Sequence, residues 1–280
     1  MILVTGATGT IGGEVVRRLR ADGVPVRALT RSATRGAGFG PEVQVAVGDL
    51  GDPGSLADAV RGVDRVLMIF AGLDGPRHDA NLARAAARAG VRHLVKLSTL
   101  GIDDGADDLI TRMHMAGEEA VAASGLDWTF LRPRAFMSNT LRWGPAIRAG
   151  DAVQLPFPDA PHASVDPRDI AGVAVRALTT PGHEGRIHRL TGPEALTPLD
   201  QLRRLSEVLG RPLRHERISL DRARELMVQQ LPGPLADALL DSSRNLVAGL
   251  KARLYGSVEE VTGRPAACFR QWAERHVAAF

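Results

Sequence analysis

The chain opens with Met1-Ile-Leu-Val-Thr5-Gly6-Ala-Thr-Gly9-Thr-Ile-Gly12, a short apolar run followed by a glycine-rich turn. An uncharged aliphatic run of this kind is typical of a strand buried in a parallel sheet. Behind the turn, Ile11, Val15 and Leu19 recur at helical spacing, so a helix is expected there. Glycines at a strand–helix junction permit a tight turn and a close approach of the backbone to a pyrophosphate. The stretch predicts the first unit of a dinucleotide-binding fold, and a tight turn without a ligand is the alternative.

The rest of the first half repeats this alternation of strands and helices. Strands are expected at 24–30, 43–47, 65–70, 93–98 and 127–131, and helices at 55–61, 81–89 and 112–123. Short buried strands separated by helices indicate βαβ units and a parallel sheet. The fold class is therefore α/β, a doubly wound parallel sheet of the Rossmann type.

The second half of the chain follows a different rhythm, because prolines interrupt it after about residue 140. Helices are expected at 168–178 and 199–209, a strand at 186–190, and mostly helix beyond 220. We expect an NADP-binding domain at 1–150 and a smaller, mainly helical substrate lobe at 151–280. Some later elements can return to the first sheet.

The composition of the 280 residues is that of a globular protein, with 44% hydrophobic and 24% charged residues. Of the 35 basic residues 33 are arginine, scattered among acids rather than gathered in a stripe, so nucleic acid is not an expected partner. The longest apolar run, Val66–Leu73, is far shorter than the roughly 20 residues of a membrane-spanning helix. A secretory leader is not expected. An internal disulfide is not expected either, since Cys268 is the single cysteine, and both points favour the cytoplasm. The histidines and the acidic loop at 103–108 lack metal-ligand spacing, so no metal is expected.

The end of the second predicted strand indicates which dinucleotide is bound. An NAD site usually places a carboxylate there, but Leu29-Thr-Arg31-Ser32 contains none, and Arg35 follows. A guanidinium suits a 2′-phosphate, so NADP(H) is the expected cofactor, although Arg31 is one arginine among many. Asp49 follows the third strand and is expected either to accept from the adenine amino group or to cap its loop. The full set of expected cofactor-binding residues is Gly6, Thr8, Gly9, Thr10, Ile11, Gly12, Arg31, Asp49, Phe70, Ala71 and Ser98.

Several segments together resemble the NmrA-like, atypical short-chain dehydrogenase/reductase family over nearly the whole chain. They are the turn at 5–12, Lys96-Leu-Ser-Thr99, the segments 124–133 and 136–139, Val165-Asp-Pro-Arg-Asp-Ile-Ala171 and Leu190-Thr-Gly-Pro-Glu194. The resemblance implies an NAD(P)-binding Rossmann domain. The family includes NADPH-dependent reductases of quinones and triphenylmethane dyes, isoflavone-type reductases, and a regulator that binds dinucleotide without evident turnover.

One departure concerns the Tyr-x-x-x-Lys pair that ordinary short-chain dehydrogenases use as general acid and pKa-lowering partner. This chain has a single tyrosine, Tyr255, and no such pair. Where the pair would fall, the sequence reads His114-Met-Ala-Gly-Glu118. Two residues four apart on a helix share a face, so His114 is expected to be a proton donor or a substrate hydrogen-bond partner, with Glu118 orienting it. A purely structural intrahelical polar pair is the alternative.

Other residues are placed near the reacting atoms by their position. Two hydroxyl residues, Ser98 and Thr99, end the fifth strand, and Thr99 is the third candidate catalytic residue. Their hydroxyls are expected either to contact the nicotinamide ribose or the substrate, or to cap the strand. About half of a group of apolar residues are expected to line the substrate site and the rest to be core. This group comprises Met68, Phe70, Met113, Met115, Phe136, Met137 and Trp143. The candidate substrate-binding residues among them are Met68, Met113, Phe136, Met137 and Trp143.

These observations favour an NADPH-dependent oxidoreductase that transfers hydride to an aromatic or quinonoid small molecule. An NADP-sensing regulatory protein and a non-redox isomerase or cyclase on the same scaffold are the alternatives. An oligomer is compatible with the sequence, which does not name the substrate.

Overall fold

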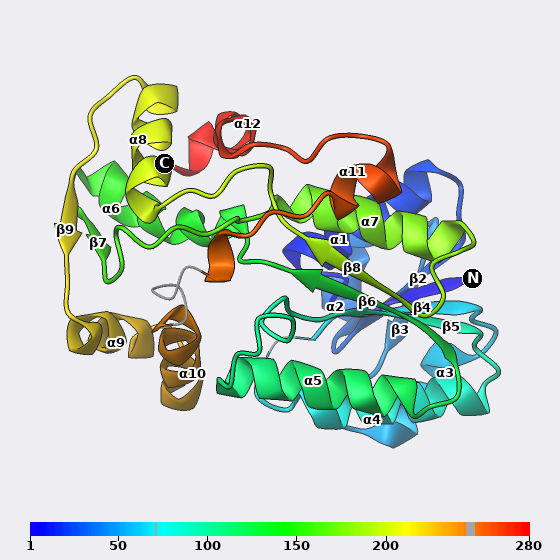
Figure 1. The fold of residues 1–280 in the computed structure, drawn as a ribbon. Coiled ribbons are helices and arrows are strands. Elements are labelled where there is room, and N and C mark those ends of the chain that lie inside the picture. Colours follow the sequence, from blue (N-terminus) through cyan, green and yellow to red (C-terminus); the bar gives the residue numbers. More distant parts are fainter. Residues whose placement is uncertain (71, 245–249) are drawn as a thin grey trace.

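The computed structural model describes residues 1–70, 72–244 and 250–280, and a seven-stranded sheet dominates it (Figure 1). The strand order is β3-β2-β1-β4-β5-β6-β8, and every neighbouring pair is parallel. The strands are β1 (Ile2–Val4), β2 (Val26–Thr30), β3 (Val43–Val47), β4 (Arg65–Met68), β5 (His93–Leu97), β6 (Asp127–Pro133) and β8 (Arg186–Leu190). The doubly wound α/β fold expected from the sequence is confirmed.

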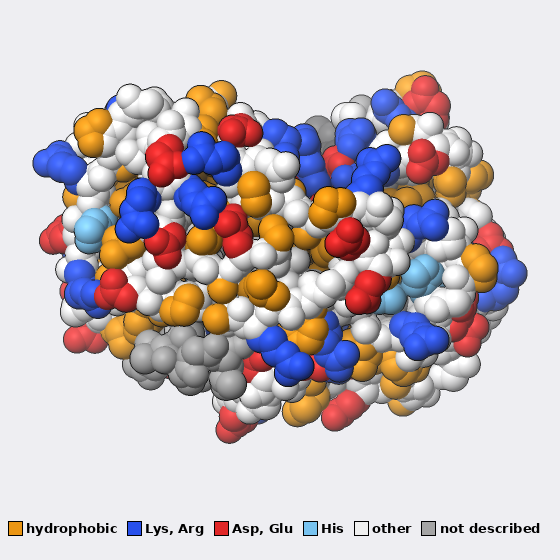
Figure 2. Space-filling view, turned by 45° about the horizontal axis from the view of Figure 1, so that its top comes forward, with side chains coloured by type: hydrophobic (Ala, Val, Ile, Leu, Met, Phe, Trp, Pro, Cys, Tyr) orange, Lys and Arg blue, Asp and Glu red, His pale blue; other side chains and the backbone are white. Residues whose placement is uncertain are grey.

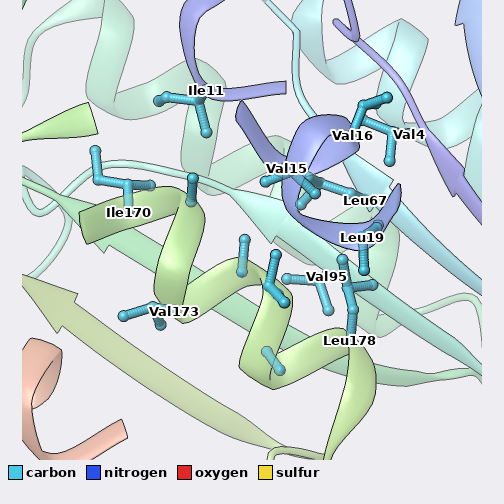
Figure 3. Packing of buried hydrophobic residues seen from close by; sticks show 14 of the residues in the cluster. Val4, Ile11, Val15, Val16, Leu19, Leu67, Val95, Ile170, Val173 and Leu178 are labelled. Atoms are coloured by element: carbon cyan, nitrogen blue, oxygen red, sulfur yellow. The ribbon is translucent and has the colours of Figure 1, made fainter. Parts of the chain in front are cut away.

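Both faces of the sheet are covered, because successive side chains of each strand point to opposite sides. On one face, Val4 of β1 packs with α1 (Thr10–Ala21), α7 (Pro167–Thr179) and α11 (Ser257–Thr262). On the other, Leu3 packs with α3 (Leu56–Val60), α4 (Gly75–Arg88) and α5 (Leu109–Ala122). Figure 3 shows the first of these cores, where α1 and α7 lie over Leu67 and Val95 of the sheet. Each fully buried valine or leucine stabilises the fold by roughly 1.5–3 kcal/mol.

Elements from the second half of the chain complete this sheet. Strand β8 pairs with β6 through the register Thr129↔Arg186 to Pro133↔Leu190, and α7 packs against α1. The seven strands therefore draw on residues up to 190. The division of the chain near residue 150 remains a prediction.

A smaller lobe stands at the carboxyl edge of the sheet (Figure 1). Its core joins the short 3₁₀ segment Met137–Trp143, α6 (Gly144–Ala149), α8 (Pro198–Leu209) and α12 (Phe269–Arg275). Two further helices, α9 (Leu220–Val228) and α10 (Gly233–Arg244), pack on each other, and α10 also contacts α5. Strands β7 (Val153–Leu155) and β9 (His215–Arg217) pair in a separate two-stranded sheet. The sequence did not reveal this sheet, because strand β9, His-Glu-Arg, is polar, exposed and only three residues long.

Helix α4 begins well before the expected start at residue 81. It starts at Gly75 and carries Pro76 in its first turn. A proline there costs little, because the N–H that it lacks would have no partner within the helix. The expected start at residue 81 therefore missed the first turns of the helix, which contain the Gly-Pro pair. The extra turns bring His78 and Asp79 into the molecule, where both are buried.

The surface agrees with the scattered arginines of the sequence. On the face shown in Figure 2, basic side chains alternate with acidic ones and with small apolar areas. Among the described residues, no helix combines the length and the apolar character needed to cross a membrane.

The candidate functional site is expected at the carboxyl edge of the sheet, because doubly wound folds bind their ligands there.

Candidate functional site

The glycine turn between β1 and α1 is so tight that position 12 admits glycine alone. Gly6 has a φ of +59°, and its carbonyl oxygen accepts from the Gly9 amide at 2.9 Å. A Cβ on Gly12 would lie 2.3 Å from that same carbonyl oxygen, a distance no real side chain tolerates. The first turn of α1 therefore lies directly against the loop, while Gly6 and Gly9 of the loop are exposed.

The start of α1 fits the pyrophosphate of a dinucleotide. Gly9 caps the helix without a side-chain hydrogen bond, and the first turn contains no acidic residue. The first N–H groups of the helix therefore retain their partial positive charge for an anion. Of the predicted binding residues, Gly6, Thr8, Gly9 and Thr10 are exposed, whereas Ile11 and Gly12 are buried. The last two can reach a ligand only through their backbone.

Thr5 holds this turn in place, a role that the sequence reading missed. Its Oγ1 accepts from the Ile69 amide at 2.8 Å and donates to the Ile69 carbonyl at 2.9 Å. The hydroxyl thereby joins the ends of β1 and β4, the strands at which the sheet order reverses. That reversal is where a doubly wound sheet opens to admit its ligand.

The end of β2 presents Arg31 to solvent. Within the described part of the chain, the structure records neither an ion pair nor a hydrogen bond of its guanidinium, so the group is available to a 2′-phosphate. Thr30 orders the turn by donating to the Ser32 carbonyl at 2.6 Å. Asp49 is exposed, and its Oδ1 accepts from the Gly51 amide at 2.7 Å. This bond is a loop cap, and the adenine contact of Asp49 stays a prediction.

Three other predicted residues lie at the ends of β4 and β5. Phe70 packs edge-on against His78, with ring centroids 4.3 Å apart. Ser98 is buried, and its Oγ has no hydrogen-bond partner among the described residues. A buried hydroxyl without a partner is costly, so this atom is a candidate to bind a ligand, and the contact of Ser98 with the cofactor stays a prediction. Thr99 Oγ1 accepts from the Gly101 amide at 3.3 Å. Ala71 lies outside the described residues.

His114 is half-buried on α5, and no hydrogen bond of its ring is recorded within the described residues. Burial lowers the pKa of His114 to about 4; the charge of Lys96 lowers it further, while Asp108 opposes both. The imidazole is therefore neutral at pH 7. A neutral imidazole donates one N–H hydrogen bond but is not a cationic acid.

The Glu118 carboxylate binds Arg132 rather than His114, which corrects the expectation from the helical spacing. The carboxylate accepts from Arg132 of β6, with Nε at 2.9 Å from Oε1 and a second bond from Nη2 to Oε2. Arg132 also donates to Asp103 at 3.0 Å. A buried carboxylate requires a partner, and the nearby guanidinium supplies it. The orienting role predicted for Glu118 is not supported by this geometry.

A buried ion pair lies beside His114 instead. Lys96 Nζ donates to Asp79 Oδ2 at 2.5 Å, and both side chains are almost fully buried. Burial raises the pKa of Asp79, and the Lys96 charge opposes that rise. A Cβ on Gly117 would lie 2.2 Å from Asp79 Oδ2, so glycine is needed on α5 at this point. The family segment at Lys96 was the only signal of this pair in the sequence.

The predicted apolar lining divides into core and candidate contacts. Met68, Met137 and Trp143 pack in hydrophobic cores with at most 6% of their surface exposed, so their assignment to the substrate site is corrected. Met113 and Phe70 lie together, on either side of the position that a Cβ of Gly75 would take. Phe136 is half-buried against the core of α1 and α7. Met115, 44% exposed, faces solvent.

The fold and this site define a dinucleotide-binding α/β protein. The family model described as NAD(P)H-binding matches residues 6–181, and the chain belongs to that family. The match extends from the glycine turn through α7.

Full-length relatives support this assignment. The (4-alkanoyl-5-oxo-2,5-dihydrofuran-3-yl)methyl phosphate reductase of Streptomyces griseus is 50% identical over 100% of this chain and 99% of its own. The NAD(P)H azoreductase of Xenophilus azovorans is 39% identical, again over 100% of this chain and 99% of its own. An NADPH-dependent quinone oxidoreductase from Escherichia coli, solved with NADPH, superimposes with a TM-score of 0.88 at 26% identity, covering 99% of this chain and 100% of that one. The resemblance to NmrA-like atypical reductases is confirmed, and the chain is an NAD(P)H-dependent reductase.

Proposed function

We propose that the protein uses NADPH to reduce a conjugated, electron-poor small molecule of the aromatic, quinonoid or unsaturated-carbonyl type. The observation that supports it best is the exposed glycine turn at Gly6–Gly12 together with an exposed Arg31 that has no recorded partner among the described residues, in a chain without a Tyr-x-x-x-Lys pair. The azo, quinone and alkanoyl-dihydrofuranone groups in the relatives' names support the acceptor class. All three can delocalise the negative charge that hydride addition brings.

The residues at the sheet edge have separate roles in this proposal. When bound, the nicotinamide supplies the hydride, that is, two electrons and one hydrogen. The Ser98 hydroxyl, buried without a partner, hydrogen-bonds to the ribose or carboxamide side of the cofactor. The neutral His114 ring donates its N–H to the oxygen or nitrogen on which negative charge develops. The balancing proton comes from water, because His114 carries no spare proton at neutral pH.

Anaerobic stopped-flow oxidation of NADPH with a panel of quinones, azo compounds and acyl butenolides tests this function. A reductase oxidises NADPH in proportion to the acceptor reduced. A dinucleotide-sensing regulator would bind NADPH without oxidising it, and an isomerase or cyclase would convert its substrate with no net loss of NADPH. Either of these results would overturn the proposal.

Arg31→Ala is expected to remove most of the preference for NADPH over NADH. A charge-assisted pair with the 2′-phosphate contributes roughly 1.5–3 kcal/mol, or about one to two decades in Kd. Kd values for both cofactors, measured by fluorescence titration, give the ratio before and after the change. Arg88→Ala, on the exposed end of α4, is the matched control and should leave the ratio unchanged. Equal Kd values for the two cofactors in the unmodified protein would rule out this role of Arg31.

A further inference from the structure

Four basic side chains from separate segments come together where the small lobe meets the sheet. They are Arg134 directly after β6, Arg142 in the 3₁₀ segment, His162 and Lys251, and we call them the basic cluster. Backbone hydrogen bonds place the segments side by side. The Val165 amide donates to the Ala135 carbonyl and the Ala163 amide to the Lys251 carbonyl, each at 2.9 Å, and the Met137 amide at the start of the 3₁₀ segment donates to the Val165 carbonyl at 3.0 Å. The cluster is therefore a product of the tertiary fold, and no run of the sequence indicates it.

The basic cluster has more positive charge than its carboxylates neutralise. Asp104 pairs with Arg134, with Nη2 at 3.2 Å from Oδ1 and a second, shorter bond. In the described part of the chain, Arg142 has no recorded ion pair, and Lys251 Nζ donates only to Ser242. Asp108, the other acid near Lys251, accepts from the Thr111 amide and hydroxyl at the start of α5.

Two buried nitrogens of the basic cluster lack partners. The Nε of Arg134 and the Nδ1 of His162 have no hydrogen-bond acceptor or donor among the described residues. Burial lowers the pKa of His162 to about 4, a backbone hydrogen bond at Ala160 opposes this shift, and the charges of Lys251, Arg142 and Arg134 add to it. A buried N–H without a partner among cationic side chains favours a bound anion.

We propose that Arg142 and Lys251, with the neutral His162 ring as a further hydrogen-bond donor, bind a phosphate ester carried by the substrate. A guanidinium and an ammonium together match the charge of a phosphate dianion, and Arg offers two parallel donors to its oxygens. Arg134, held by Asp104, supports the site from its buried side. The inference rests on the proposed reductase function and specifies its substrate class. The methyl phosphate in the name of the 50% identical reductase is consistent with it.

The basic cluster is distinct from the sites of the cofactor's own phosphates. Those phosphates are assigned to the glycine turn after β1 and to Arg31 after β2. Strands β4 and β5 separate β1 from β6, so Arg134 lies about 14 Å from the glycine turn at the usual strand spacing of about 4.8 Å. The cluster lies near the end of β5 instead, because the Leu100 amide, which follows Ser98 and Thr99, donates to the Pro133 carbonyl at 3.0 Å, directly before Arg134.

The test compares two acceptors that differ only in the phosphate. One is the (4-hexanoyl-5-oxo-2,5-dihydrofuran-3-yl)methyl phosphate, and the other is the alcohol that alkaline phosphatase makes from it. We expect the unmodified protein to have a kcat/KM about ten- to a hundredfold higher for the phosphate, as one to two charge-assisted contacts provide. Arg142→Ala should lower this ratio about tenfold, and Lys251→Met should lower it as well. Arg84→Ala, exposed on the outer side of α4, is the control and should leave it unchanged.

A binding measurement that needs no turnover separates this inference from the function on which it rests. The same phosphate is titrated calorimetrically into protein saturated with NADP⁺, which blocks the cofactor's own phosphate sites. Binding that weakens about tenfold in Arg142→Ala, and not in Arg84→Ala, supports the subsite even if no acceptor is reduced. Equal kcat/KM for phosphate and alcohol, or equal binding by both variants, overturns the subsite while leaving the reductase function intact.

Discussion

Gly9→Val should abolish measurable NADPH binding while leaving the protein folded. Gly9 has a φ of −89° and a ψ of 175°, which valine adopts readily, and an added Cβ would meet only the Gly6 carbonyl oxygen at 3.3 Å. The branched side chain would instead occupy the space in front of α1 that the pyrophosphate needs. Losing two or more charge-assisted hydrogen bonds, each of about 1.5–3 kcal/mol, weakens binding by more than about a hundredfold. Calorimetric titration with NADPH measures the loss.

A second glycine provides the control for this change. Gly233 begins α10, where an added Cβ would meet nothing closer than the end of Arg224 at 3.9 Å. Gly233→Val should therefore bind NADPH as the unmodified protein does. Both variants should keep the far-ultraviolet circular dichroism of the parent. Normal NADPH affinity in a folded Gly9→Val protein would contradict the assignment of the glycine turn to the cofactor.

His114→Ala should slow reduction about 10²–10³-fold without weakening NADPH binding, as removal of a single donor to a developing anion does. The loss should appear in kcat rather than in the Kd of the cofactor. It should shrink for acceptors whose reduced form is a stable anion, because these need less help from a hydrogen bond. His114→Gln, which retains an N–H donor, should recover part of the rate. Met115→Ala, an exposed neighbour on the same helix, is the matched control.

The pH dependence distinguishes a hydrogen-bond donor from a cationic acid at this position. The pKa of His114 is lowered to about 4, so the ring is neutral throughout the range from pH 6 to 8. A neutral donor predicts a kcat that is flat with respect to His114 over this range. A cationic acid would instead lose about tenfold in rate for every pH unit above 4. Such a steep decline, absent in His114→Ala, would require a protonated ring and would contradict the proposed role.

The sequence predicted those features that depend on neighbouring residues. The buried run at the start of the chain, the glycines behind it and the helical spacing of Ile11, Val15 and Leu19 lie within twenty residues, and together they determine the first βα unit. The parallel sheet followed from repetition of the same local pattern.

Contacts between distant segments could not be predicted in this way. The spacing of His114 and Glu118 correctly placed both on one helix, but it did not reveal that Arg132 lies across from Glu118. Likewise, Met68 carries the same side chain as Met113, and only its position on the face of β4 that packs against α3, α4 and α5 makes it core. The pair of Lys96 and Asp79 depends on the first turns of α4, which precede the helix expected at 81–89.

The packing of α7 on α1 has a consequence for how the chain is made. Residues 22–166 are synthesised between these two helices, so the apolar side of α1 stays uncovered while most of the sheet is already available. The free edge of β6 likewise waits for β8, which ends at Leu190. At about 5–20 residues per second, the apolar side of α1 is exposed for roughly ten to thirty seconds and the edge of β6 for roughly three to ten. Ribosome-associated chaperones have their natural target in this period.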